Sequence, residues 1–130
     1  MNKELFAANG VFSAIATIIA NALGGWNLGL QALVTLVIID YITGVTVAIV
    51  ERKLSSEVGA RGIAKKVMIF ALVYIAVLVD QITNTDLVKT ATIMFYIANE
   101  GISILENAGK IGVPYPQTLK NILAQLKNKN

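Results

Sequence analysis

The forty-six residues from Leu5 to Val50 contain a single acidic side chain, Asp40, and no lysine or arginine. A helix crosses the hydrocarbon core of a bilayer with about 20 predominantly apolar residues, so this stretch is long enough for two crossings. Only 15% of the whole chain is charged, whereas soluble domains average about 25%. A soluble domain of this size leaves too much surface exposed to bury so many apolar side chains. The sequence therefore predicts an integral membrane protein.

The chain contains neither cysteine nor histidine. This excludes a disulfide framework, a thiolate or imidazole metal site, and Cys–His or Ser–His–Asp nucleophiles. The net charge is +3, but the basic residues flank apolar segments and form no patch among aromatic residues, so no nucleic-acid partner is expected. We predict that the protein is not an enzyme and uses no metal and no cofactor.

Four apolar stretches approach the length of a membrane span. They cover about residues 5–23, 28–50, 67–82 and 87–105, with a loop over 51–66. In the second, thirteen Leu, Ile and Val residues at about −0.4 kcal/mol each outweigh a cost of about 3 kcal/mol for Asp40. The fourth is only marginally apolar and is expected to insert beside partner helices. The predicted fold is a single all-α membrane domain over residues 1–130, with about four transmembrane helices and a C-terminal amphipathic helix.

The C-terminal tail has a helical pattern of its own. Pro114 and Pro116 end the preceding helix, because proline lacks the backbone donor and has a fixed φ. Four apolar residues then follow at the spacing i, i+3, i+4, i+7, namely Leu119, Ile122, Leu123 and Leu126. This spacing predicts an amphipathic helix over residues 117–127 that lies on the inner leaflet or packs against a neighbour.

The basic residues indicate how the chain is oriented in the membrane. Five lie in the loop 51–66, four in the tail and one at Lys3, whereas the segment after the third span holds only Lys89. The positive-inside rule then places both termini and the loop of this multi-pass protein in the cytoplasm. The expected cytoplasmic anchors are Arg52, Lys53, Arg61, Lys65 and Lys66.

Two shorter motifs near these boundaries have alternative interpretations. The triplet 20–22 has the small-x-small pattern of a signal-peptide cleavage site, but polar residues interrupt the apolar stretch before it, which favours a retained span. The loop segment 59–66 lacks the spacing of a phosphate-binding loop. Ser55 or Ser56 is instead expected to cap a short interfacial helix that leads into the third span.

Polar residues inside the first span form a stripe with a spacing of four. They are Asn9, Ser13, Thr17 and Asn21. Such a stripe either lets helices pack closely and form hydrogen bonds across an interface, or lines a water-filled path in an oligomer.

Asp40 is the one acid in the second span, and Thr43 and Gly44 share its face of the helix. No predicted span has a basic residue near its middle, so Asp40 is expected to lack a counter-ion and to be protonated, hydrated or hydrogen-bonded to another helix. An intramembrane carboxylate is a candidate functional residue. The alternative is a purely structural role in holding helices together.

The end of the fourth span carries the densest group of polar residues. Glu100, Ser103 and Asn107 share one face, and Asn99 and Glu106 lie at its flanks. With Asp40 and Thr43, we regard them as candidates for intramembrane gating, and we group Gly44 with the stripe of the first span as candidates for helix packing or pore lining.

Depth in the membrane relates these acids to one another. With a rise of 1.5 Å per residue, Asp40 and Glu100 both lie roughly 13–16 Å from the inner boundary. They could therefore meet through a shared proton or water. Glu106 lies nearer the interface, where Lys65 or Lys66 could pair with it.

Several motifs occur in an order that identifies a family resemblance. Trp26 is followed by Asp40-Tyr-Ile-Thr-Gly44, Leu54-Ser-Ser56 with Gly59, Gly62 and Lys65-Lys66, Asp80, the segment from Asn99 to Asn107, and Gly112-Val-Pro114-Tyr-Pro116. In this order the chain resembles the phage lysis and toxin-secretion holins of Gram-positive bacteria and their phages. The resemblance extends from Trp26 to the tail.

The resemblance implies a small multi-pass protein of the bacterial cytoplasmic (inner) membrane. Such a protein accumulates, associates with itself and opens lesions in that membrane. Its partners would be further copies of the chain, membrane lipids, and functionally an endolysin or an exported toxin. The family supplies no catalytic residues, so Asp40 and Glu100 remain candidates from the sequence alone.

Two other classes fit parts of the sequence. A small proton-coupled exporter could be built around one membrane carboxylate, although the ten-to-one bias of basic residues disfavours the subtype that inserts in both orientations. A small membrane lipid kinase could bind Mg²⁺ through Glu100, Glu106 and Asn107, but nothing in the chain resembles a nucleotide site.

Overall fold

The computed structural model describes residues 2–128, and within them the secondary structure is entirely helical. The elements are α1 (Lys3–Ala22), α2 (Leu28–Val50), α3 (Ser56–Thr83), α4 (Leu87–Ile111) and α5 (Gln117–Asn128). The all-α prediction is confirmed. The last lysine of the basic tail, Lys129, lies outside the described residues.

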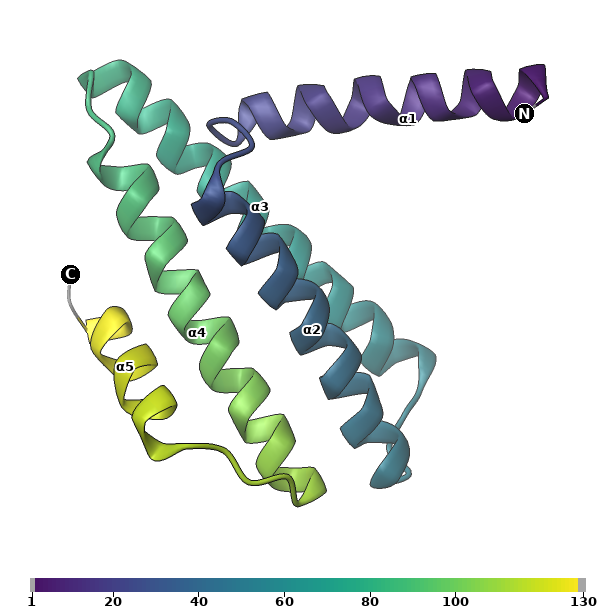
Figure 1. The fold of residues 1–130 in the computed structure, drawn as a ribbon, viewed down its shortest axis with the longest axis vertical. Helices are drawn as coiled ribbons and strands as arrows, with labels where there is room; N and C mark the ends of the chain where they lie inside the picture. The colour runs from purple at the N-terminus through teal and green to yellow at the C-terminus, as the bar shows by residue number, and fades with distance from the viewer. Residues whose placement is uncertain (1, 129–130) are drawn as a thin grey trace.

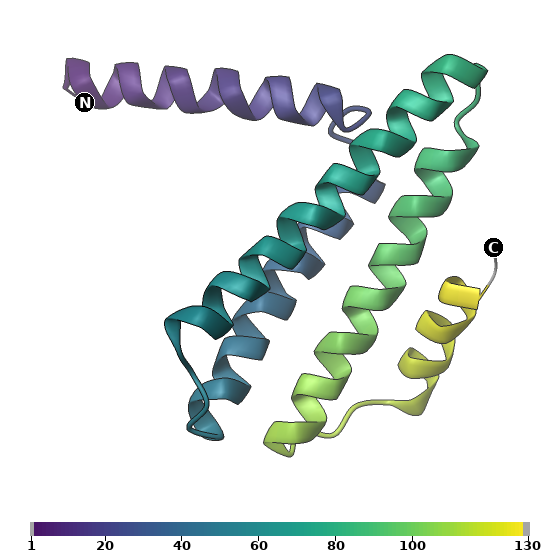
Figure 2. The same ribbon diagram turned by 180° about the vertical axis from the view of Figure 1, so that it is seen from behind.

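Three helices form a bundle and a fourth lies against it (Figure 1). α4 packs against both α2 and α3, and α5 packs along the other side of α4. α1 diverges from the bundle near the start of α2, as both ribbon views show (Figure 2), and none of its residues is buried. The fold therefore consists of a compact α2–α3–α4 bundle, an α5 arm and a separate apolar helix.

Capping residues explain where the helices begin and end. The side chain of Asn27 accepts a hydrogen bond from the Leu30 amide at 3.0 Å, and that of Ser55 accepts one from Val58 at 3.1 Å. These bonds satisfy amides that have no partner within the first turn of a helix. α4 ends at Gly112, whose φ of 97° suits glycine because the residue lacks a Cβ atom.

α3 differs most from its expected range. Residues 51–66 were expected to form a loop containing a short interfacial helix, yet one continuous helix begins at Ser56 and extends to Thr83. Ser55 caps it, as expected for one of the two serines, and no proline interrupts the residues that follow. α4 also continues beyond the expected end at residue 105, to Ile111. Both extensions bring polar residues into regular helix.

The apolar core lies in the half of the bundle nearer to α1. It contains Leu23, Leu30, Leu33, Val37, Ile69, Val73 and Ile93. Burying one such side chain contributes roughly 1.5–3 kcal/mol, so this cluster holds α2, α3 and α4 together. In the opposite half of the bundle, Asp40, Glu100 and Asn107 are buried together with the apolar side chains of Val47 and Leu105.

Three helices in the described chain are long and apolar enough to cross a membrane, namely α1, α2 and α3. α4 was expected to be the fourth span, but it is not among them. Its polar side chains lower its hydropathy, and its neighbours α2, α3 and α5 cover much of its surface. A topology of four crossings is therefore still a prediction.

Candidate functional site

Three helices contribute one buried ion cluster, which consists of Asp40, Lys66 and Glu100. The Lys66 Nζ donates hydrogen bonds to a carboxylate oxygen of Asp40 and to Oε1 and Oε2 of Glu100, at 3.0 and 2.7 Å for the glutamate. Asp40 is 6% exposed and Glu100 only 2%, and the side chain of Lys66 is 20% exposed. One ammonium group thus joins α2, α3 and α4.

The expectation that Asp40 lacks a basic partner is wrong. It assumed that the third span starts after Lys66, whereas α3 starts at Ser56 and carries Lys66 within its third turn. The two carboxylates do lie at the same level, as their equal depth predicted, but Lys66 joins them. A buried charge is strongly destabilising without a partner, so the cluster gives each charge an opposite one.

Asn107 extends the ion cluster along α4. Its Nδ2 donates to Asp40 Oδ1 at 3.1 Å and to Thr43 Oγ1 at 2.9 Å, and the residue is 9% exposed. The Thr43 hydroxyl donates to backbone oxygens one turn earlier in α2. Every buried side-chain nitrogen or oxygen of the described residues has a hydrogen-bond partner. The arrangement is therefore a complete polar network, which favours one defined packing of the helices.

Small residues on α3 allow this network to form. A Cβ atom on Gly62 would lie only 3.2 Å from the Tyr41 ring, and the Tyr41 hydroxyl donates to the Gly59 carbonyl at 3.3 Å. The tyrosine therefore lies against the bare backbone of α3, and Lys66 follows one turn after Gly62. On α2, a Cβ on Gly44 would lie 3.8 Å from Asn107 Nδ2, so this glycine is close to the network.

A small cavity of about 220 Å³ opens beside the ion cluster. Its lining comprises Asp40, Tyr41, Gly44, Val45, Val58, Gly62, Lys66, Ser103 and Asn107. Ser103, predicted to share a face with Glu100, thus lies at the same site. Because polar groups line the cavity and it exceeds the volume of one water, roughly 30 Å³ in the liquid, it can hold several waters beside the charges.

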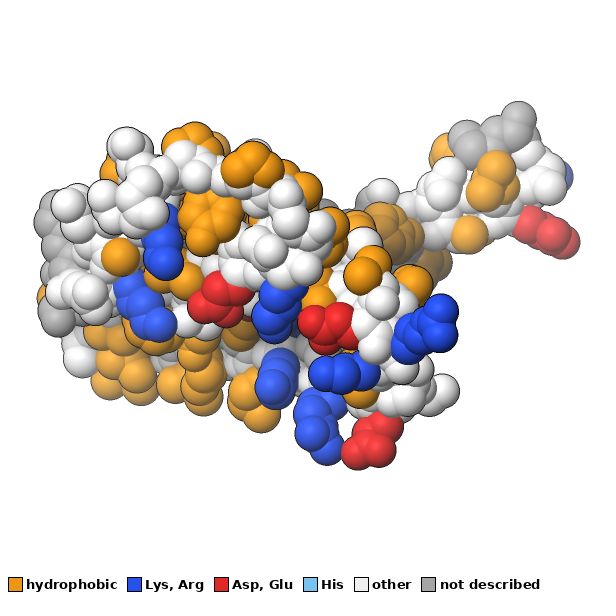
Figure 3. Space-filling view, turned by 90° about the horizontal axis from the view of Figure 1, so that it is seen from below, with side chains coloured by type: hydrophobic (Ala, Val, Ile, Leu, Met, Phe, Trp, Pro, Cys, Tyr) orange, Lys and Arg blue, Asp and Glu red, His pale blue; other side chains and the backbone are white. Residues whose placement is uncertain are grey.

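Lysine and arginine side chains gather on the face of the molecule that is seen from below (Figure 3). Of the remaining charged candidates, Arg52 and Lys53 lie in the α2–α3 loop, Arg61 and Lys65 in the first three turns of α3, and Glu106 near the end of α4. Arg52, Lys53, Arg61 and Lys65 are exposed, as is Glu106. Arg61 pairs with Glu57 at 3.1 Å, one turn earlier in the helix. Lys66 was grouped with these anchors and considered as a partner of Glu106, but it contacts Asp40 and Glu100 instead. Asn99 is half-buried.

The polar stripe of α1 is exposed along its whole length. The ion cluster includes none of its four residues, Asn9, Ser13, Thr17 and Asn21. The Thr17 hydroxyl donates a hydrogen bond to the backbone carbonyl of Ser13 in the same helix. Two of the four line an otherwise apolar groove of about 740 Å³ between α1 and the bundle. The choice between helix packing and pore lining stays a prediction.

Asp80 has a structural role that the sequence motifs alone did not indicate. It is 5% exposed, and its carboxylate accepts hydrogen bonds from the amides of Val88 and Lys89, at 3.0 and 2.8 Å, and from the Thr85 hydroxyl at 2.7 Å. The last turn of α3 thereby caps the first turn of α4. Asp86, directly before α4, makes no side-chain capping bond.

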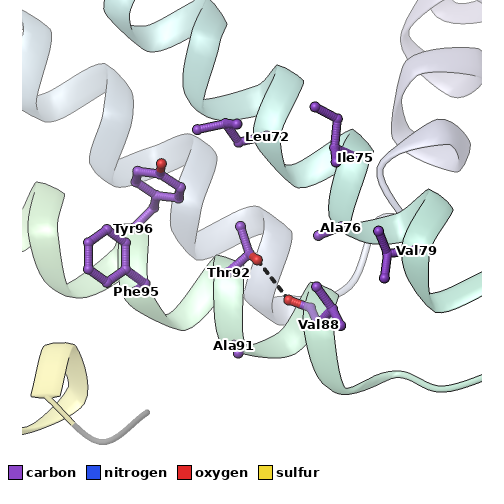
Figure 4. Close-up of a pocket in the computed structure, with 9 residues that line it drawn as sticks. All are labelled: Leu72, Ile75, Ala76, Val79, Val88, Ala91, Thr92, Phe95 and Tyr96. Carbon is purple, nitrogen blue, oxygen red and sulfur yellow. Dashed lines mark hydrogen bonds between the residues drawn. The ribbon is translucent and has the colours of Figure 1, made fainter. Parts of the chain in front are cut away.

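An apolar crevice of about 380 Å³ lies between α3 and α4, near the Asp80 cap (Figure 4). Its lining is aliphatic and aromatic apart from the Thr92 hydroxyl, which donates to the Val88 carbonyl of its own helix, and the phenol of Tyr96. Nor do the described residues form a group of three acidic side chains placed to hold a metal ion. The ion cluster and its cavity are therefore the strongest candidate site.

Comparison with known proteins connects this architecture to one family. The sequence pattern that defines the bacteriophage holin family matches residues 17–128 of this chain, which include α2 to α5 and the whole ion cluster. The chain belongs to the bacteriophage holin family. This is not a family of enzymes, and together with the long apolar helices it makes the chain a holin-like membrane protein.

Similar chains occur in several bacteria. An uncharacterized 14.9 kDa protein in the nagH 3′ region of Clostridium perfringens is 40% identical over 118 residues, 89% of each chain. An uncharacterized protein of Halalkalibacterium halodurans is 41% identical over 121 residues, 88% of this chain and 90% of the relative. The uncharacterized protein YtkC of Bacillus subtilis is 32% identical over 124 residues, 92% of each chain. No solved structure matches.

Proposed function

We propose that this protein acts as a holin. It accumulates in the cytoplasmic membrane of a bacterium, associates with further copies of itself, and opens lesions that release an endolysin or export a large cargo such as a toxin. The observation that carries the proposal is the family match over residues 17–128. Three long apolar helices support it, because they give the chain the means to remain in the bilayer.

The surface of the protomer is consistent with self-association. None of the residues of α1 is buried in the protomer, and its stripe of Asn9, Ser13, Thr17 and Asn21 is exposed. Small polar side chains in a membrane helix promote association, because they allow close approach and hydrogen bonds between helices. We propose that copies of the chain meet through α1.

The distribution of charge supports an orientation with both termini in the cytoplasm. Lys53 lies in the α2–α3 loop, Arg61 and Lys65 lie in the second and third turns of α3, and Lys110 lies in the last turn of α4. The single basic residue of the α3–α4 region, Lys89, lies near the other end. Basic residues favour the cytoplasmic side of a membrane, and the proposed orientation follows from this asymmetry.

Timed expression in a bacterium tests the proposed function. Cells would produce the protein alone, a cytoplasmic endolysin alone, or both, with membrane potential followed by a fluorescent dye and lysis by turbidity. We expect an abrupt loss of potential in both cultures that contain the protein, and lysis only where the endolysin is also present. Unchanged potential with retained endolysin would contradict the proposal, and resistance to a toxic substrate would favour the exporter.

A further inference from the structure

The ion cluster combines two acids with a single base. Asp40 and Glu100 are both buried, and both bond the same atom, the Nζ of Lys66. Because an N–H···O hydrogen bond spans about 3 Å, the two carboxylates lie within roughly 6 Å of each other. With all three groups ionised, two negative charges and one positive charge would leave one uncompensated negative charge inside the protomer. Such a charge is strongly destabilising.

No other side chain of the described residues supplies the missing positive charge. Lys66 is the one base within ion-pair distance of either acid in that part of the chain. The neighbouring titratable group on α2 is Tyr41, whose hydroxyl donates to a backbone carbonyl of α3. On α5, which packs on α4, Lys127 lies 6.0 Å from the centroid of an aromatic ring of α4. Six further charged side chains of α3, α4 and α5 are exposed, namely Glu57, Arg61, Lys65, Glu106, Lys110 and Lys120.

The two acids differ in how they are hydrogen-bonded. Asp40 accepts a bond from the Asn107 amide at 3.1 Å in addition to the bond from Lys66. Among the described residues, both oxygens of Glu100 are bonded by Lys66 alone. Hydrogen bonds that a carboxylate accepts favour its ionised form. Asp40 is therefore the better ionised partner of Lys66, and Glu100 is the acid that gains more from a bound proton.

The cavity beside the ion cluster connects the site to water. Its volume of about 220 Å³ is sufficient for several waters, and Asp40, Lys66, Ser103 and Asn107 are among the residues that line it. A divalent metal ion fits the site poorly, because Mg²⁺ and Ca²⁺ take six or more ligands, chiefly oxygen atoms. Here the Lys66 ammonium and the Asn107 amide both direct N–H groups at Asp40. A proton needs only one free lone pair of a carboxylate oxygen.

We infer that the ion cluster is a proton-binding site, in which Glu100 takes one proton from cavity water and shares it with Asp40. The proton joins a carboxylate oxygen without any change of oxidation state, and it makes the cluster neutral. Its release leaves one uncompensated negative charge between α2, α3 and α4 and weakens their contact. The protomer itself buries both acids, so the charge imbalance is the same at any depth in a bilayer and with any function of the protein.

Infrared spectroscopy of the purified protein in detergent micelles detects the proton directly. A protonated carboxyl group has a carbonyl stretching band that an ionised one lacks, and labelling glutamate with carbon-13 assigns the band. We expect the band near neutral pH in the natural chain and in Glu106→Gln, which changes an exposed acid of the same helix. We expect no band in Glu100→Gln or in Asp40→Asn, where Lys66 keeps one acidic partner and no negative charge is in excess.

The pH dependence of stability measures the same proton independently. Unfolded glutamates ionise above about pH 4.3, whereas the folded chain keeps its proton to higher pH. The folded state then binds more protons than the unfolded state, so stability falls as the pH rises. Over the range in which only the folded state holds the proton, the unfolding equilibrium constant should rise about tenfold per pH unit relative to Glu100→Gln. Glu106→Gln should behave like the natural chain.

The natural chain alone can overturn the inference, whether or not a variant folds. Absence of the carboxyl band from the folded natural chain near neutral pH would do so, as would a band that persists in both Glu100→Gln and Asp40→Asn. Stability that depends on added Mg²⁺ or Ca²⁺, without a carboxyl band, would show that a metal ion supplies the missing charge instead.

Discussion

Asp40, Lys66 and Glu100 are single residues of three different helices, and each depends on the others for its burial. The ammonium group of Lys66 is the one positive charge bonded to both carboxylates among the described residues. Removing one partner from a buried ion pair typically costs 3–5 kcal/mol, roughly, because the remaining charge has no compensation. The net contribution of an intact buried ion cluster, compared with apolar residues packed in its place, is much smaller than this cost.

Replacing Lys66 by methionine should therefore reduce stability strongly. Methionine keeps the length of the side chain but leaves Asp40 and Glu100 without a cation, and we expect a loss of about 3–5 kcal/mol. The free energy of unfolding of the purified protein in detergent micelles, measured with denaturant, checks this. Lys65→Met is the matched control, because the neighbouring Lys65 is exposed. Equal effects of the two substitutions would contradict the role of the ion cluster.

A rescue experiment separates charge from packing. Adding Asp40→Asn and Glu100→Gln to Lys66→Met removes all three charges while preserving the approximate shapes of the side chains. We expect the triple variant to recover part of the lost stability, because no buried charge is then unpaired. A triple variant less stable than Lys66→Met would show that the carboxylates stabilise the bundle independently of Lys66.

The residues of the site were largely predictable from the sequence, but their partner was not. Asp40, Glu100, Ser103 and Asn107 stood out because they are polar residues in apolar spans, and all four line the ion cluster or its cavity. Lys66 was misplaced because charge alone suggested a loop. A helical pattern was present, since Gly59, Gly62, Lys66, Ile69, Val73, Ala76 and Asp80 recur at three or four residues along one face of α3.

At the scale of elements, the contact between α3 and α4 depends on a cap supplied from outside the helix. Asp80→Ala removes the acceptor of two α4 amides, so we expect a loss of about 1–2 kcal/mol, typical of a helix N-cap. Asp86→Ala, at the formal cap position without a capping bond, should change stability little. Hydrogen exchange of the first turn of α4 would locate the effect. An equal loss of hydrogen-exchange protection in Asp80→Ala and Asp86→Ala would contradict the capping role of Asp80.

The packing of α5 on α4 is tested by two glycines of the same helix. Gly109→Ala should stabilise α4 by about 0.5–1 kcal/mol, because alanine has the better helix propensity and nothing lies within 4 Å of its Cβ. Gly101→Ala should lose that gain, because Leu123 must move. Trypsin should then cleave faster at Lys120 in Gly101→Ala. Identical stability and cleavage in the two variants would show that α5 is not held at Gly101.

The helices differ in how well sequence alone defines them. α2 has the range of its expected span because Asn27 caps an uninterrupted apolar run that ends at charged residues. α3 and α4 are longer than expected because hydropathy marks the part of a helix suited to lipid and not the helix itself. The docking of α5 on α4 depends on the bare backbone of Gly101, a tertiary contact that amphipathic spacing does not specify.

At the scale of the whole molecule, two sources of information address different questions. The asymmetry of basic residues concerns which end of the bundle faces the cytoplasm. The fold shows which helices are neighbours, with α4 between the α2–α3 pair and α5. Neither fixes the number of crossings, because α4 is less apolar than the three long helices and α1 diverges from the bundle.

Labelling of single cysteines before the lesions open would determine the number of crossings. With four crossings and both termini inside, cysteines replacing Trp26 and Asp86 should react with an impermeant maleimide added to intact cells, because the α1–α2 and α3–α4 turns then face outward. Cysteines replacing Lys53 and Val113 should react only after permeabilisation. The four residues lie in or beside connections between helices. Labelling at Val113 in intact cells together with protection at Lys53 would mean that α4 does not cross, and the α4–α5 arm would then lie on the outer side.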